Sequence, residues 1–342
     1  MPEGHSVHRI ARQFGRNFVG RSVSVSSPQG RFAEGARELD GRTILTSRAV
    51  GKQMFLEFDG ALWMRVHLGL YGAWDFAGDI LTDESMRPIV NRRRAATAAG
   101  ESAPPDIIPG PAFAAERDGR GRRDDEDSLA SIGAPRLARI RMSEDESGAV
   151  VLQEFPPEPV GAVRVRLLAD DVVADLRGPT KCEVLTAEEV QGVIDRLGPD
   201  PLVDPPKKGE ARFVETVSKK RTPIGLLLMD QSVVSGIGNI YRAELLFRAR
   251  IDPHTPGKEL SVDQLRTLWK DWSKLLRVGV EVGQILTIDA QLPSRRNSRL
   301  KPRSERHWVY HRTGLPCRVC GTPIAMEDAA GRKLYWCPTD QV

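Results

Sequence analysis

The chain has 342 residues, which is longer than one ordinary domain and predicts two or three folded units; 40% of them are hydrophobic, enough for ordinary cores. A net charge of +4 excludes bulk basicity as a means of binding nucleic acid, so any such binding must depend on local clusters of basic residues. The sequence contains neither a run of about 18 apolar residues nor a signal peptide, which favours a soluble, intracellular protein without membrane partners.

The first part of the chain is predicted to form one helix followed by strands. Residues 5–18 carry apolar side chains at helical spacing, and Gly4 allows the backbone to bend just before them. Residues 21–75 contain short apolar and β-branched runs separated by turns. That pattern is typical of a β domain.

Residues 80–155 break this pattern. They are rich in alanine, glycine and charge, for example at 92–94 and 116–127, and most of the stretch lacks hydrophobic periodicity. Such a composition buries too little apolar surface to fold, so we predict a disordered insertion. Strand-like sequence resumes at Val163–Leu167, which indicates that the insertion interrupts the β domain.

From about residue 186 the periodicity becomes helical. Thr222 is predicted to cap a helix that has Pro223 at its first position. A turn from Ser232 to Gly238 leads to a second helix, Asn239–Arg248, and a third helical stretch covers Leu265–Leu276.

The start of the chain, Met1-Pro2-Glu3-Gly4, offers a nucleophile if Met1 is removed, which the small residue at position 2 favours. The secondary amine of Pro2 can then form an iminium with an aldehyde or with C1′ of a sugar. Only the unprotonated amine can attack, and an unperturbed α-amino group has a pKa near 8. The cationic iminium acts as an electron sink, which favours loss of a base and elimination of phosphates.

Glu3 and Lys52 are the predicted acid–base partners of Pro2. Glu3 can shuttle protons on the sugar oxygen, and Lys52 can donate to a phosphate or to the sugar ring. Plainer interpretations stay open, because Glu3 also suits a helix N-terminus and Lys52 suits a solvated strand end.

The turn Ser235-Gly236-Ile237-Gly238-Asn239 places two glycines before a helix. Its backbone N–H groups suit an anion such as a DNA phosphate, and Asn239 adds a side-chain donor. As an isolated motif it is more often a packing turn between two helices. Lys219-Lys220-Arg221 adds positive charge nearby.

The C-terminus carries a zinc-ribbon spacing, Cys317-x2-Cys320-x16-Cys337-x2-Asp340, with aspartate in the fourth place. The clustered cysteines fit metal binding in a reducing compartment better than disulfides. A metal-free hairpin, or His307 or His311 as a ligand, is an alternative. The hairpin would present Arg332 from a tight turn, either to hold phosphates around a flipped nucleotide or simply to solvent.

In their order along the chain these motifs resemble the formamidopyrimidine-DNA glycosylase/endonuclease VIII family, closest to its actinobacterial endonuclease VIII-like branch. The resemblance covers roughly 1–75 and 160–342. It is carried by the segments MPEG at 1–4, GK at 51–52, HLGLYG at 67–72, DLRGP at 175–179, PIGLLLMDQ at 223–231 and GIGNIYRAE at 236–244.

The resemblance implies roles for individual residues. Pro2 would be the Schiff-base nucleophile, Glu3 the general acid/base, and Lys52 a group that assists at the lesion. Asn239 and Arg332 would grip phosphates. Leu70 and Tyr71 would fill the gap left by an extruded base, and the segment Asp175–Pro179 would support the cleft. A structural Zn²⁺ would be bound by Cys317, Cys320, Cys337 and Asp340. A buried Leu-Tyr pair and an ion pair between Asp175 and Arg177 are the plainer alternatives.

The resemblance also implies an α+β, two-lobed fold. The N-terminal β-sandwich with flanking helices would cover 1–190, the helix–two-turn–helix domain 191–292, and the zinc-finger β-hairpin 293–342. Asp340 departs from the family, which has a fourth cysteine there, and the insertion replaces a shorter connection.

The function implied is a bifunctional DNA glycosylase and abasic-site (AP) lyase of base-excision repair, monomeric, in the bacterial cytoplasm and at the nucleoid in use. It would act on double-stranded DNA that contains a damaged base or an abasic site, favouring oxidised pyrimidines, and finish by β,δ-elimination. The alternatives are an 8-oxoguanine- or formamidopyrimidine-selective glycosylase, a non-catalytic damaged-DNA-binding protein with this fold, and a zinc-ribbon sequence-specific DNA binder.

Overall fold

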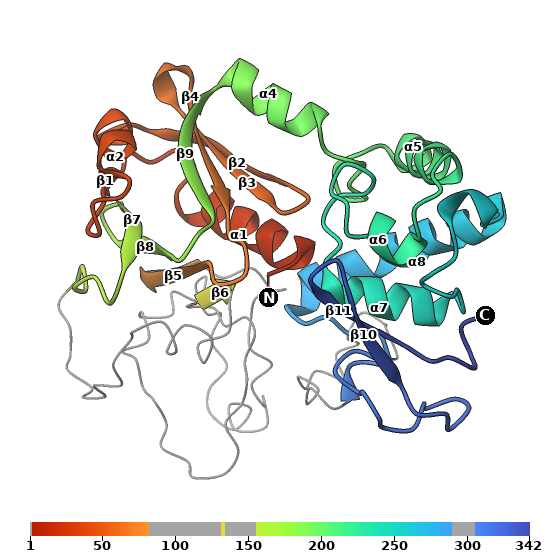
Figure 1. Cartoon of the computed structure of the whole chain (residues 1–342). Coiled ribbons are helices and arrows are strands. Elements are labelled where there is room, and N and C mark those ends of the chain that lie inside the picture. Colours follow the sequence, from red (N-terminus) through yellow and green to blue (C-terminus); the bar gives the residue numbers. More distant parts are fainter. Residues whose placement is uncertain (1, 82–130, 134–154, 289–304) are drawn as a thin grey trace, which may run out of the picture.

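The computed structural model describes residues 2–81, 131–133, 155–288 and 305–342. The chain forms two lobes, one built from strands and one mainly from helices, and its N-terminus lies between them (Figure 1). The predicted two-lobed α+β fold is therefore confirmed. None of the helices in these ranges combines the length and apolar composition that a bilayer span requires.

The first helix, α1 (Gly4–Asn17), packs one apolar side against the strands, close to the predicted bounds of 5–18. Phe14 is fully buried, with its ring centroid 4.8 Å from that of Trp74 and 5.3 Å from that of Phe76. Truncating such a core aromatic to alanine costs about 3–5 kcal/mol, so these contacts fix the helix on the sandwich.

The described strands of this lobe form two antiparallel sheets. One sheet has the order β1-β7-β8-β5-β6, with the bounds β1 (Ser24–Ser26), β7 (Val163–Leu168), β8 (Val172–Arg177), β5 (Ala73–Gly78) and β6 (Ser131–Gly133). The other has the order β2-β3-β4-β9, with the bounds β2 (Ile44–Val50), β3 (Gln53–Phe58), β4 (Leu62–His67) and β9 (Lys181–Thr186). The short helix α2 (Ala33–Leu39) and the 3₁₀ turn Asp59–Ala61 complete the lobe.

Most of the predicted insertion, 80–155, lies outside the described residues, but its prediction of disorder is wrong for β6. This strand pairs with β5 through Trp74↔Ile132, and Ile132 is fully buried. One apolar residue in a three-residue strand is too short a signal to show alternation in the sequence.

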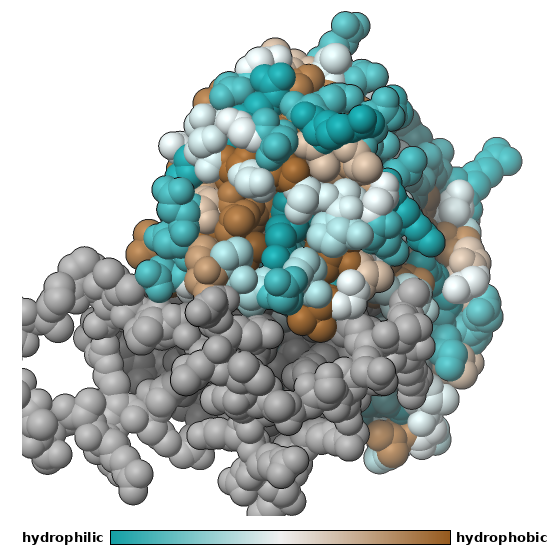
Figure 2. Space-filling view, turned by 90° about the vertical axis from the view of Figure 1, so that its left-hand side faces the viewer, coloured by the Kyte–Doolittle hydropathy of each residue, from teal (hydrophilic) through white to brown (hydrophobic). Residues whose placement is uncertain are grey.

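The outer face of this lobe, turned toward the viewer in Figure 2, carries polar and apolar side chains interspersed.

The helical lobe begins after α4 (Ala187–Asp195), which covers the second sheet through the buried Val190 and Val193. The domain boundary proposed at residue 190 falls inside this helix. The remaining helical elements are α5 (Pro206–Ser218), α6 (Ile224–Leu227), α7 (Asn239–Arg248), the 3₁₀ turn Gly257–Glu259 and α8 (Val262–Val282).

The ends of the helices in this lobe agree only in part with those predicted from the sequence. The predicted bounds of α7 are confirmed. The prediction that Thr222 caps a helix is wrong, because α6 begins at Ile224 and Pro223 occupies the cap position without a side-chain hydrogen bond. By contrast, α8 has a reciprocal cap between Ser261 and Gln264, which stabilises its start.

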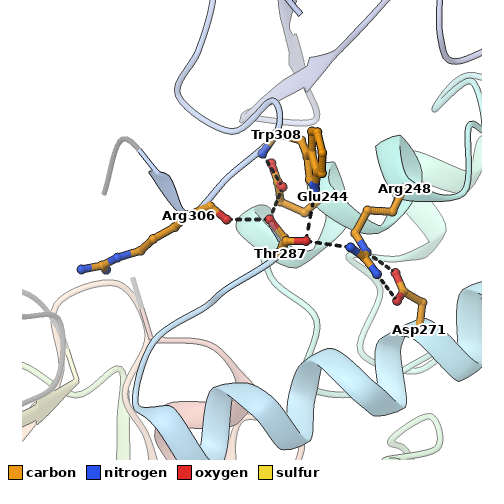
Figure 3. A network of polar contacts seen from close by, with 6 residues as sticks. All are labelled: Glu244, Arg248, Asp271, Thr287, Arg306 and Trp308. Atoms are coloured by element: carbon orange, nitrogen blue, oxygen red, sulfur yellow. Dashed lines mark hydrogen bonds and ion pairs between the residues drawn. The ribbon is translucent and has the colours of Figure 1, made fainter. Parts of the chain in front are cut away.

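The C-terminal hairpin joins β10 (Ala325–Ala329) to β11 (Arg332–Trp336) through Ala330 and Gly331, both at positive φ, and thus places Arg332 at the start of β11. The segment that leads to it is held by Glu244 of α7 (Figure 3). This fully buried carboxylate accepts hydrogen bonds from the N–H groups of Trp308, Val309 and Tyr310 at 2.8–2.9 Å. Helix α7 therefore carries the hairpin.

Candidate active site

Glu3 lies fully buried at the N-terminus of α7, far away in sequence. Its carboxylate accepts hydrogen bonds from the N–H groups of Gly238 and Ile240, each at 2.8 Å, and Tyr241 at 3.3 Å. N–H groups at a helix start lack partners within the helix and carry positive partial charge, so a carboxylate there is stabilised. Glu3 is thus a helix-capping carboxylate, but of α7 rather than of its own helix.

This capping corrects the prediction for the tandem-glycine turn, since these N–H groups bind the protein's own carboxylate rather than a phosphate. The glycines are needed for the close approach. A β-carbon at Gly238 would lie 2.4 Å from Cδ of Glu3, and one at Gly51 would lie 2.6 Å from Cβ of Ser235. In addition, the Gly4 N–H donates to the Gly236 carbonyl at 2.9 Å. The turn therefore clamps the chain start and the β2–β3 turn against α7.

Asp200, in the connection between the lobes, secures the residue before Lys52. Its buried carboxylate accepts from the Gly51 N–H at 2.6 Å and the Leu202 N–H at 2.8 Å, and lies 2.8 Å from Nε2 of His8 on α1. Burial raises the pKa of Asp200, but the hydrogen bond and charge of His8, with the N–H donors, outweigh it and hold the pKa below its usual range. Asp200 therefore ties α1, the Lys52 turn and the linker together.

We expect Asp200→Asn to lower the free energy of unfolding by about 1–3 kcal/mol, because an amide N–H₂ would replace an acceptor oxygen in a buried site. Because the folded pKa of Asp200 is depressed, its contribution to stability is present at neutral pH and is lost as the pH falls through the folded pKa, below the range in which an ordinary aspartate titrates. Urea unfolding at pH 7 measures the loss. Asp195→Asn, at an exposed helix end, is the control, and equal stability of the two variants would contradict the role given to Asp200.

Lys52 is electrostatically coupled to the other predicted catalytic groups. Desolvation lowers the pKa of Lys52 to about 8, with Glu3 acting to raise it and Arg332 to lower it. Burial raises the pKa of Glu3, while Lys52 and the N–H groups of α7 act in the opposite direction. Glu3, Lys52 and Arg332 come from the chain start, the first lobe and the hairpin, so the fold brings three distant segments together. Pro2 is buried beside Glu3.

Asn239 lies where α7 meets the hairpin. Its Nδ2 donates to the carbonyl of Lys333 at 2.9 Å, next to Arg332, and its Oδ1 accepts from Arg242. The fully buried Arg242 also donates to the Lys333 carbonyl at 3.1 Å. These contacts fix the position of β11, and with it the half-buried Arg332.

Leu70 and Tyr71 project from the loop between β4 and β5, with exposed fractions of 37% and 47%. The alternative of a buried pair is therefore wrong. The alternative ion pair between Asp175 and Arg177 is wrong as well. Arg177 pairs with Asp75 instead, and the two carboxylate oxygens of Asp175 each accept from Arg166 at 2.7 Å.

The four predicted metal ligands, Cys317, Cys320, Cys337 and Asp340, converge with their donor atoms within 4.8 Å of one another. Sγ of Cys317 lies 3.0 Å from Oδ2 of Asp340, and Sγ of Cys320 lies 3.4 Å from Sγ of Cys337. Ligands about 2.0–2.3 Å from a tetrahedral zinc lie about 3.3–3.8 Å apart. The Cys320–Cys337 distance lies in that range and the Cys317–Asp340 distance just below it, so a small outward shift of one side chain would let this donor set hold a structural zinc ion. Among the described residues His307 and His311 are not part of this group.

Sequence reasoning missed Asp200, His8, Arg242 and Glu244, and it missed that Arg9 is buried. Arg9 of α1 donates to the carbonyl of Val280 at 2.8 Å, near the C-terminal end of α8. A cation there suits the negative end of the helix dipole, as the Glu3 carboxylate suits the N-terminal end of α7. The motif at 236–244 contains Arg242 and Glu244 and could have flagged them. Nothing in the sequence near His8 or Asp200 signals their partners, which lie far along the chain.

Comparison with known proteins agrees with this geometry. Residues 1–103 match the formamidopyrimidine-DNA glycosylase N-terminal domain, 197–290 its H2TH domain, and 314–342 the zinc finger found in FPG and IleRS. The chain is 37% identical over 345 residues to Endonuclease 8 1 of Mycobacterium tuberculosis and of Mycobacterium bovis, with 100% of each chain covered. The chain belongs to the formamidopyrimidine-DNA glycosylase/endonuclease VIII family. It is also 36% identical to the formamidopyrimidine-DNA glycosylase of Thermus thermophilus over 146 residues, 43% of this chain and 54% of that one.

Solved structures of the family share the fold. MutM (Fpg) from Thermus thermophilus aligns with a TM-score of 0.63 at 22% identity, over 99% of this chain and 98% of that one. Lactococcus lactis Fpg in complex with abasic-site DNA aligns with a TM-score of 0.62 at 18% identity, over 99% of each chain. The zinc-finger match covers the cluster of Cys317, Cys320, Cys337 and Asp340, and the cluster is compatible with a structural zinc ion.

Proposed function

We propose that this chain is a bifunctional DNA glycosylase/AP lyase that excises oxidised bases, with pyrimidines favoured, from double-stranded DNA. One observation carries the proposal: Glu3, next to Pro2, caps α7, and the charges of both Glu3 and Arg332 act on Lys52. The Mycobacterium relatives are named endonuclease 8, and the family models are named for a DNA glycosylase. The protein would act as a monomer in the cytoplasm, at the nucleoid.

The chemistry follows from these groups. The damaged nucleotide leaves the base stack, at a cost of a few kcal/mol. The imino nitrogen of Pro2, freed by removal of Met1, bonds to C1′ as the C1′–base bond breaks and the base departs with a proton. The C1′–O4′ bond then breaks as O4′ takes a proton, which leaves an iminium between the Pro2 nitrogen and C1′. Loss of a proton from C2′ expels the 3′ phosphate, and loss of a proton from C4′ then expels the 5′ phosphate. Water finally hydrolyses the C1′–nitrogen bond and regenerates Pro2.

Glu3 and Lys52 would move the protons in these steps. Glu3 is excluded from water, and burial raises its pKa, so its carboxyl takes up a proton more readily than an exposed glutamate does. Lys52, in its protonated form, would donate to the sugar oxygen or a phosphate. Asn239 and Arg332, which lie on α7 and β11, would hold the flanking phosphates.

The pKa of Lys52, about 8, predicts the pH above which the rate of base excision begins to fall. If protonated Lys52 is required, single-turnover base excision should fall tenfold per pH unit above about 8. Lys52→Arg should move this decline to higher pH, because a guanidinium stays charged, whereas Arg65→Lys, on a neighbouring strand, should leave it in place. An unchanged alkaline limb in Lys52→Arg would assign the titration to another group.

The preference for oxidised pyrimidines rests on Leu70 and Tyr71, whose exposed loop is free to enter a duplex. Single-turnover excision of thymine glycol and of 8-oxoguanine from matched duplexes would decide it. Faster removal of 8-oxoguanine would favour the alternative, a glycosylase selective for 8-oxoguanine or formamidopyrimidines.

Borohydride trapping separates this enzyme from a non-catalytic DNA-binding protein of the same fold. The mature protein should form a covalent adduct with an oligonucleotide that contains an abasic site, because reduction fixes the iminium. Protein that retains Met1 should bind the same DNA without cross-linking. Tight binding without any adduct by protein shown to begin at Pro2 would support the non-catalytic alternative.

A further inference from the structure

A pocket of about 620 Å³ opens on the helical lobe between α5, α8 and the linker that follows Asp200. Its apolar lining includes Trp269 and Val278, each 3% exposed, which therefore form the floor. Pro201 and Pro206 also line it. Stacking of Trp269 on Phe213, with ring centroids 5.7 Å apart, keeps the floor rigid. The pocket therefore offers a fixed apolar surface.

Four cations line the same pocket: Lys207, Lys270, Lys274 and Arg277, all exposed. Within the described ranges no ion pair involves any of them, and the one acidic lining residue, Glu210, lies 3.5 Å from Arg266 instead. Unpaired positive charge therefore surrounds the apolar floor.

The arrangement of these cations disfavours the free helix. Lys270, Lys274 and Arg277 are spaced by four and three residues on α8, so they lie on one side of it as neighbouring like charges. Each such pair destabilises a helix by about 0.2–0.5 kcal/mol. The acidic neighbours on the same helix, Asp271 and Glu281, pair with Arg248 and Arg12 instead, so neither forms an ion pair with these cations. Charge repulsion that destabilises the helix and gives no structural benefit indicates that these side chains bind an anion.

The shape of the pocket identifies the anion. The phosphate backbone of duplex DNA would satisfy the lysines but has no apolar group to cover Trp269 and Val278. A peptide with carboxylates on either side of an apolar side chain satisfies both, because the apolar group fills the floor and the carboxylates meet the rim. We propose that this pocket docks an acidic segment of a partner protein through an apolar anchor.

Fluorescence anisotropy with the full-length, zinc-loaded protein tests this docking. The probe is a labelled eight-residue peptide with three aspartates on each side of a central leucine–phenylalanine pair. We expect micromolar binding, which Lys274→Glu weakens about tenfold because one attraction is lost and one repulsion gained. Replacing the central pair of the peptide by serines should weaken binding as strongly.

Lys258→Glu is the matched control, because Lys258 is exposed in the same lobe but does not line the pocket. Both variants should retain wild-type lyase activity on a short abasic-site duplex, which shows that they fold. Absence of peptide binding at about 1 mM, or equal weakening by Lys258→Glu, would overturn the proposal. Displacement of the peptide by undamaged duplex, with Lys274→Glu weakening that duplex tenfold as well, would overturn it in favour of a DNA contact.

Discussion

Replacing Glu3 by glutamine is expected to lower the rate of base excision by about 10²–10⁴-fold, the usual contribution of a positioned general acid/base. The same change weakens the cap of α7, because an amide N–H₂ would face the backbone N–H groups that now meet carboxylate oxygens. Loss of a charged cap costs about 1–2 kcal/mol. That is small beside an ordinary stability of about 5–15 kcal/mol, so the protein should remain folded and the rate loss should be chemical.

Single-turnover kinetics on a duplex with an oxidised base, together with thermal unfolding, separates these two effects. Glu189→Gln is the matched control, because Glu189 caps the start of α4 through its carboxylate at an exposed position away from the lobe interface. It should keep full activity and lose little stability, because glutamine can still cap at this position, as Gln264 does at the start of α8. If Glu3→Gln kept full excision, Glu3 would be a helix cap alone.

Removal of zinc should have the second-largest effect. Structural zinc contributes about 10–16 kcal/mol of apparent binding energy in small zinc domains, far more than the hairpin's apolar contacts can replace. Without the ion, β11 should lose its fixed position, and with it the contacts of the Lys333 carbonyl with Asn239 and Arg242 that place Arg332. We expect DNA cleavage to fall at least a hundredfold after chelation and to return when zinc is added back.

Variants of the fourth ligand refine this test. Asp340→Ala should lose zinc to a competing chelator sooner than the wild type, and Asp340→Cys should lose it later, because zinc binds thiolate readily. Cys182→Ser removes a cysteine that is not part of the cluster and should behave as wild type in zinc content. Full cleavage by zinc-free protein would show that the hairpin holds Arg332 without metal.

The parts of the fold that the sequence predicted are those with local signals. The bounds of α7 follow from the glycines before it and its own periodicity, and the zinc cluster follows from cysteine spacing. The prediction failed at β6, where pairing with a distant strand supplies the order. It also failed at Thr222, where a four-residue helix starts after Pro223 and leaves the threonine outside.

The same division holds at the active site. Pro2, Glu3 and Lys52 could be named because their chemistry is visible in the side chains themselves. That Glu3 would cap α7, and that Asp200 would hold Gly51 and His8, depends on contacts between residues about 150 to 240 positions apart. No local pattern encodes such a pairing, so a buried carboxylate in a proline-flanked linker gives no sign of its partner.

The most direct test of the account is to locate the covalent bond between protein and DNA. Mature protein is incubated with an abasic-site duplex, reduced with borohydride, digested and analysed by tandem mass spectrometry. The account predicts a deoxyribose remnant on the nitrogen of the N-terminal peptide that begins at Pro2. A remnant on a lysine side chain such as Lys52, with an unmodified N-terminal peptide, would contradict it.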